Sequence, residues 1–82
     1  MNNLKTLKDI IDNMEDSIKS TYDRNAHEFD NSRDKRILTA TTNDYYKYLN
    51  LLKKLVKAEE KRKNVKLDFM SNDIEEIKYH EY

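Results

Sequence analysis

The chain has 82 residues, and its Lys+Arg and Asp+Glu are balanced at 16 each, so the formal net charge is zero. This length predicts a single domain over residues 1–82, and the balanced charge argues against a general nucleic-acid binder. Only 37% of the residues are hydrophobic. That fraction is low for a globular domain and favours paired helices with one buried stripe each over a sandwich or an α/β fold.

Glycine, proline and cysteine are all absent from the chain. Without glycine the sequence lacks the usual residue of phosphate-binding loops and tight hairpins, so we expect few turns and a largely helical chain. Without cysteine, neither a disulfide nor a thiolate metal site can form. The first residues lack the pattern of a signal peptide, and no apolar run approaches membrane-spanning length. We therefore expect a cytoplasmic protein with no membrane partner.

The first expected element is a helix over about residues 3–29. Its apolar residues recur at steps of three and four along one stripe, and charged residues occupy the other side. The stripe consists of Leu4, Leu7, Ile11, Met14, Ile18, Tyr22, Ala26 and Phe29. A short polar turn at 30–32 follows, and its brevity predicts that the next helix runs back antiparallel to the first.

The second expected helix covers about residues 32–63 and contains the most apolar stretch of the chain. Its predicted buried stripe is formed by Tyr45, Leu49, Leu52 and Val56, widened by Tyr48 and Leu55. Poor helix formers favour a break near 40–43, whereas the unbroken phase of the stripe favours one continuous helix. We prefer the continuous helix and keep the broken version as the alternative. Basic residues at 61–63, followed by Asn64, suit a helix C-terminus.

After Asn64 the helical period gives way to alternation. Over residues 65–70 the apolar Val65, Leu67 and Phe69 alternate with Lys66, Asp68 and Met70. This period predicts an extended segment that lies as a strap on the hairpin or pairs with a strand of another chain. Residues 72–79 predict a short C-terminal helix, because acidic residues follow a capping serine or asparagine. The expected fold is therefore all-α, an antiparallel helical hairpin with a short extended segment and a short C-terminal helix. Such a hairpin could dimerise into a four-helix arrangement.

The sequence carries no pattern for catalysis, cofactor binding or metal binding. Asp23 and His27 share a helical face, but two ligands do not complete a zinc site. The carboxylates are spread over solvated helix faces, where nothing would shift a pKa toward acid–base catalysis. We therefore predict a non-enzymatic protein with no cofactor, no metal and no small-molecule substrate.

Protein binding is the function predicted by elimination. Tyrosine and leucine outside the core stripe are typical of contact surfaces. The candidate contact residues are Tyr46, Tyr48, Leu51, Leu67, Phe69 and Tyr79. The expected partner is a second copy of the chain or a host protein complex of replication, transcription or defence. This expectation follows an analogy with the small regulators and inhibitors of phages and mobile elements, whose AT-rich genomes favour this composition.

Two alternatives stay open, namely a small helical nucleic-acid-binding protein and a structural assembly subunit. The first depends on a basic end of the second helix, formed by Lys53, Lys54, Lys57, Lys61, Arg62 and Lys63. Glu59 and Glu60 interrupt this run, and acidic residues of the first helix would face it across the hairpin. Pairing of these charges within the chain is therefore the simpler interpretation.

Overall fold

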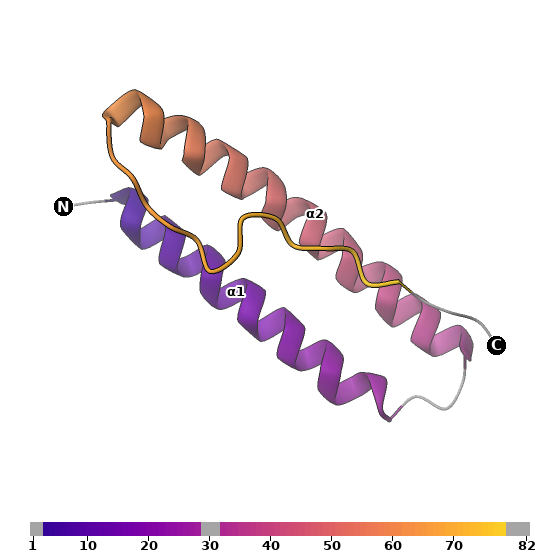
Figure 1. The fold of residues 1–82 in the computed structure, drawn as a ribbon. Coiled ribbons are helices and arrows are strands. Elements are labelled where there is room, and N and C mark those ends of the chain that lie inside the picture. The colour runs from indigo at the N-terminus through magenta and orange to yellow at the C-terminus, as the bar shows by residue number, and fades with distance from the viewer. Residues whose placement is uncertain (1–2, 29–31, 79–82) are drawn as a thin grey trace.

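The structure is a computed structural model that describes residues 3–28 and 32–78. These residues form two helices, α1 (Asn3–Ala26) and α2 (Ser32–Lys63), which pack antiparallel along most of their length (Figure 1). Residues 65–78, here called the strap, then run back along the hairpin without regular secondary structure (Figure 1). The described fold is thus an all-α hairpin, as the sequence predicts.

α2 is one unbroken helix, which confirms the preferred prediction for residues 32–63. Thr39 and Thr42 are poor helix formers near the predicted break, and the helix accommodates them because their hydroxyls donate back to carbonyls one turn earlier. Thr39 donates to the Lys35 carbonyl at 2.8 Å, and Thr42 donates to the Leu38 carbonyl at the same distance. These bonds satisfy the hydroxyls inside the helix, so the polar side chains do not interrupt it.

The helix ends agree in part with the sequence. α1 ends at Ala26, short of the predicted end at Phe29, which lies outside the described residues. At the end of α2, Asn64 has a φ of 56° and so takes the left-handed C-cap conformation expected from its position. The Val65 N–H donates to the Glu60 carbonyl at 3.0 Å, the long bond of a Schellman cap. This cap turns the chain away from the helix axis and starts the strap.

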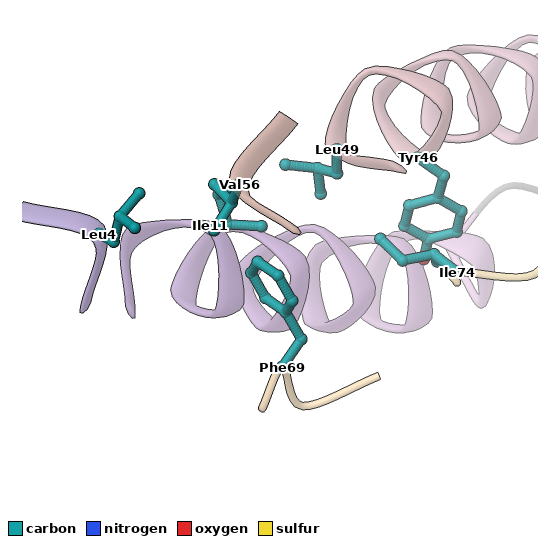
Figure 2. Packing of buried hydrophobic residues seen from close by; sticks show 7 residues of the cluster. All are labelled: Leu4, Ile11, Tyr46, Leu49, Val56, Phe69 and Ile74. Atoms are coloured by element: carbon teal, nitrogen blue, oxygen red, sulfur yellow. The ribbon is translucent and has the colours of Figure 1, made fainter. Parts of the chain in front are cut away.

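The core lies between the two helices and beneath the strap. Its buried apolar residues are Leu4, Ile11, Tyr46, Leu49, Val56, Phe69 and Ile74. Figure 2 shows Phe69 and Ile74 extending from the strap toward the residues of the two helices. Because a bare helix pair covers each stripe on one side only, the strap supplies the third layer that this core needs.

The buried stripe of α2 is rotated relative to the predicted one. Leu49 and Val56 are 2% exposed, as expected, but Leu52 is 37% exposed, and its prediction as a central core residue is wrong. Tyr46 and Lys53 complete the buried row instead, at 4% and 1% exposed. The apolar stripe predicted from the sequence is wider than the contact with α1, so only two of its six residues, Leu49 and Val56, face the core.

The predicted short C-terminal helix does not form over residues 72–78, the part that the structure describes. The backbone N–H and carbonyl of Ile74 are bonded to the side chain of Asn50, and those of Ile77 to Asn43. Backbone groups engaged in this way cannot also form helical bonds four residues apart. Contacts with α2 therefore override the local helix signals.

The first part of the strap keeps the apolar alternation that the sequence shows. Phe69 is 8% exposed and Leu67 is half-buried, whereas Lys66 and Asp68 between them are exposed. Leu67 and Phe69 therefore face the hairpin and the charged residues between them face water, whereas Val65 is 37% exposed. Addition of residues 65–70 to a strand of another chain stays a prediction.

Candidate protein-binding surface

One side of the hairpin is covered by the strap, whose backbone is held by two asparagine side chains of α2. The Asn50 amide donates to the Ile74 carbonyl at 3.1 Å, and the Ile74 N–H donates back to Asn50 Oδ1 at 2.9 Å. Asn43 makes the same pair of bonds with Ile77, at 2.9 and 2.7 Å. The two helical turns between the asparagines span about 10 Å, as do three residues of extended chain. The amides therefore hold the strap in a fixed register.

An ion pair between Glu15 and Lys53 lies at the centre of this side, between the helices and the strap. Lys53 Nζ donates to Glu15 Oε1 at 2.6 Å, and the two side chains are 1% and 0% exposed. Lys53 Nζ also donates to the Ser71 carbonyl at 2.6 Å, and Ser71 Oγ donates to Glu15 Oε2 at 2.8 Å. Lys19 donates to the same carboxylate at 2.9 Å. The network joins α1, α2 and the strap, and the charges of Glu15 and Lys53 both have their partners.

The Glu15 carboxyl is held in its charged form. Burial by itself would raise its pKa, because the ionised form loses solvation. Hydrogen bonds from Lys53, Lys19 and Ser71 outweigh this effect and hold the pKa of Glu15 below its ordinary value. A carboxylate with these donors is a structural anchor, and it is poorly suited to exchange protons with a substrate.

The other side of the hairpin carries two rows of residues without a single charge. The row in α1 consists of Leu7, Ile10, Met14, Ser17 and Thr21, and the row in α2 consists of Leu38, Thr41, Tyr45, Tyr48, Leu52 and Leu55. Steps of three and four residues keep each row on one side of its helix. Although 39% of the chain is charged, neither row contains Lys, Arg, Asp or Glu. We call these two rows the uncharged face.

The uncharged face and the strap lie on opposite sides of the buried row. In α2, Tyr48 directly precedes the buried Leu49, and Asn50, which holds the strap, directly follows it. α1 repeats this order at positions 10–12, where the carboxylate of residue 12 accepts a bond from the strap. Successive helix residues point about 100° apart. The two faces therefore flank the core from opposite directions.

The uncharged face is open to solvent, and its two ends differ in shape. Toward the C-terminal end of α2 it carries large apolar side chains, with Tyr48 64% and Leu55 65% exposed. Toward the connection between the helices there is a hollow of about 300 Å³, where the small side chains of Ser17, Thr21 and Thr41 lie between larger ones that include Leu38 and Tyr45. One end of the face therefore projects and the other is recessed.

The contact residues predicted in α2 lie in different environments. Tyr48 and Leu51 are exposed, at 64% and 56%, but only Tyr48 belongs to the uncharged face. Tyr46 is 4% exposed, and burial raises the pKa of its hydroxyl. Because a buried side chain offers no surface to a partner, we assign Tyr46 to the core and no longer to the contact surface.

The contact residues predicted in the C-terminal part are used mainly within the chain. Phe69 is buried in the core, and Leu67 is half-buried and packs against it. Tyr79 lies outside the described residues. Neither Phe69 nor Leu67 is therefore part of the open face.

The basic residues of the nucleic-acid alternative are not all exposed. Lys53 is buried against Glu15, which corrects its assignment to a basic surface. Lys57 is half-buried, and the Arg62 guanidinium is paired with Glu59 at 2.7 Å. The exposed members of the set are Lys54, Lys61, Arg62 and Lys63. The candidate surface for nucleic acid is therefore smaller than the sequence indicated.

Sequence reasoning missed most of the uncharged face. Five of its residues were assigned to buried stripes, yet Leu7, Met14, Tyr45, Leu52 and Leu55 are 40%, 43%, 52%, 37% and 65% exposed. A usable signal was present, because both helices contain a second row at steps of three and four that lacks charge in a highly charged chain. A helical row that faces only water would be expected to contain charged residues, so the absence of charge from this row indicates a contact surface.

Comparison with known proteins does not assign the chain to a class. No protein family matches it, and searches of curated proteins and of solved structures returned no significant match. Over residues 3–28 and 32–78, no three metal-ligating side chains are grouped around a common point. Neither of the described helices is long and apolar enough to cross a membrane. The function is therefore inferred from the surface itself.

Proposed function

We propose that the protein is a non-enzymatic protein-binding module that uses the uncharged face as its contact surface. The proposal is carried by one observation, the exclusion of charge from two adjacent helical rows that are open to solvent. Protein interfaces deplete charged residues at their centres and enrich aromatic residues and methionine. The occupant is a protein surface that is itself apolar, because a charged one would lose its hydration without finding a partner charge.

The opposite side of the hairpin supports the same assignment. The amides of Asn43 and Asn50 are used to hold the strap, and the charges of Glu15 and Lys53 are used by each other. Groups engaged in this way are occupied within the chain, which argues against a catalytic role for them. The uncharged face exposes apolar side chains that the chain itself does not cover, so it is the side that a protein partner would cover.

Two more specific roles rest on this surface. Regulation or inhibition of a host protein complex, as by a phage or mobile-element protein, is a prediction from composition. A structural assembly subunit would use the same face to bind copies of itself. Nucleic-acid binding is the weaker alternative, because the side chain of Lys53 is buried and cannot contribute to an exposed basic surface.

The proposal is tested by affinity capture with three immobilised proteins, namely the native chain, Tyr48→Glu and Lys47→Gln. Both substitutions lower the net charge by one and lie next to each other in α2, but only Tyr48 belongs to the uncharged face. Cell extract and untagged copies of the chain serve as sources of partners. We expect a partner that the native chain and Lys47→Gln retain and Tyr48→Glu loses.

High salt provides the second readout of this experiment. Capture through an uncharged face should survive added salt, whereas nucleic-acid binding should weaken steeply. Retention of the same molecules by all three proteins would contradict the proposal, as would capture that salt abolishes. Circular dichroism of each variant shows that the helices are intact before binding is compared.

A further inference from the structure

Resting on the proposed function, we propose that the occupant of the uncharged face is a second copy of this chain, docked antiparallel to the first. The two copies form a four-helix arrangement in which each hairpin is one layer and the straps lie on the two outer sides. Four helices can enclose a shared apolar core and form a stable bundle, whereas two helices alone leave one side of each helix uncovered.

The absence of charge suits a symmetric contact. In a twofold dimer the same surface patch lies on both partners, so residues near the axis meet their own copies. A charged patch would therefore place like charges together, which opposes association. The uncharged face carries no such penalty, because neither of its rows contains an ionisable Lys, Arg, Asp or Glu.

The dimensions of the molecule show how much of a dimer interface the uncharged face can form. It is 48 Å long and 18 and 14 Å across its shorter dimensions. A standard protein interface takes about 800 Å² from each partner. The uncharged rows cover residues 7–21 and 38–55, about 21 and 26 Å of helix. They therefore occupy roughly the middle half of the hairpin and form the centre of such an interface, and the flanking residues supply the rest of its area.

The shape of the face selects the antiparallel arrangement. A twofold axis across the middle of the face places the projecting end of one copy over the recessed end of the other. The row in α1 then brings large residues against small ones, as interdigitating layers require, with Leu7 facing Thr21 and Ile10 facing Ser17. In the row of α2, Leu52 faces Thr41, whereas the remaining pairs, Leu38 with Leu55 and Tyr45 with Tyr48, are apolar or aromatic contacts between large side chains. A parallel arrangement would crowd the large ends together and leave the hollow lined by Ser17 and Thr21 unfilled.

Engineered disulfides test this arrangement, because the native chain has no cysteine. We expect Thr41→Cys mixed with Leu52→Cys to crosslink into a dimer, and each variant alone to remain largely uncrosslinked. The two positions are eleven residues apart, about 16 Å along the helix, and a disulfide needs Cα atoms within about 7 Å. Met14→Cys, at the middle of its row, should crosslink with its own copy.

Sedimentation of the same proteins completes the test. The native chain and Lys47→Gln should sediment with twice the mass of one chain, and Tyr48→Glu should lose this association. Crosslinking of Thr41→Cys alone as readily as in the mixture would overturn the antiparallel arrangement. A native chain that sediments as a single copy across micromolar concentrations would overturn the dimer. In that case the capture experiment still decides, separately, whether the face binds another protein.

Discussion

Replacing Lys53 with methionine is expected to lower the free energy of unfolding by about 3–5 kcal/mol, the usual cost of breaking a buried ion pair from one side. The substitution leaves the Glu15 carboxylate fully buried, with Lys19 and Ser71 as its remaining donors. Urea denaturation at neutral pH measures the change. A loss below about 1 kcal/mol would be typical of a solvated ion pair and would contradict the buried network.

Two further variants distinguish the loss of the ion pair from nonspecific effects of replacing a lysine of α2 on the free energy of unfolding. Glu15→Leu combined with Lys53→Met should recover most of the lost stability, because an apolar pair of similar volume is often as stable as a buried ion pair. Lys54→Met makes the same chemical change at an exposed neighbour and should alter the free energy of unfolding by less than about 0.5 kcal/mol. A loss for Lys54→Met as large as for Lys53→Met would mean that the helix itself is perturbed.

The ion pair also predicts a direction of pH dependence. Hydrogen bonds lower the pKa of Glu15 in the folded state below its ordinary value of 4.5. The stabilisation by this carboxylate is therefore complete above that ordinary value and is lost as the pH falls through the lower folded pKa. The variant that lacks both Glu15 and Lys53 should lose less stability on acidification than the native chain does.

The second large effect is expected at Ile11, which is 1% exposed at the centre of the core. Ile11→Ala should cost about 2–5 kcal/mol, because it removes buried methylene groups and leaves a cavity between the helices. Leu52→Ala serves as the matched control, since Leu52 is 37% exposed and lies on the uncharged face. In dilute solution, before any association, Leu52→Ala should cost clearly less. If Ile11→Ala and Leu52→Ala lowered the free energy of unfolding equally, Leu52 would belong to the core, as the wider apolar stripe predicts.

The sequence predicts the helical elements well because their signals are local. The continuous period from Arg33 to Lys63 and the left-handed C-cap at Asn64 follow from residues that contact each other within a turn or two of the same helix. Such features depend on backbone geometry and hydrogen bonds that sequence spacing describes directly.

The rotation of the buried row could not be predicted in this way. Lys53 is buried because Glu15 and Ser71 approach it from two distant parts of the chain. Hydropathy assigns a lysine to water, and no local pattern shows that its charge is matched 38 residues away. The strap is similar, because its path depends on asparagine amides that bond its backbone and so leave no trace in its own side chains.

Only part of the candidate contact surface could be predicted from the sequence. Tyr48 was identified as a contact residue from its position at the margin of the apolar stripe, and it is 64% exposed. Tyr46, two positions earlier, was grouped with it although it faces the core. A periodic pattern gives the number of rows on a helix, but the row that faces inward is decided by the partner helix and the strap.

Tyrosine modification under native conditions tests the central claim most directly, because Tyr46 and Tyr48 report on the core and on the uncharged face. The dilute protein is treated with an acetylating reagent, and the labelled sites are read by mass spectrometry. We expect Tyr48 to react and Tyr46 to stay protected, and we expect the reaction at Tyr48 to slow when the protein is concentrated or bound to its captured partner. Equal reactivity of Tyr46 and Tyr48, or a rate at Tyr48 that association leaves unchanged, would contradict the account.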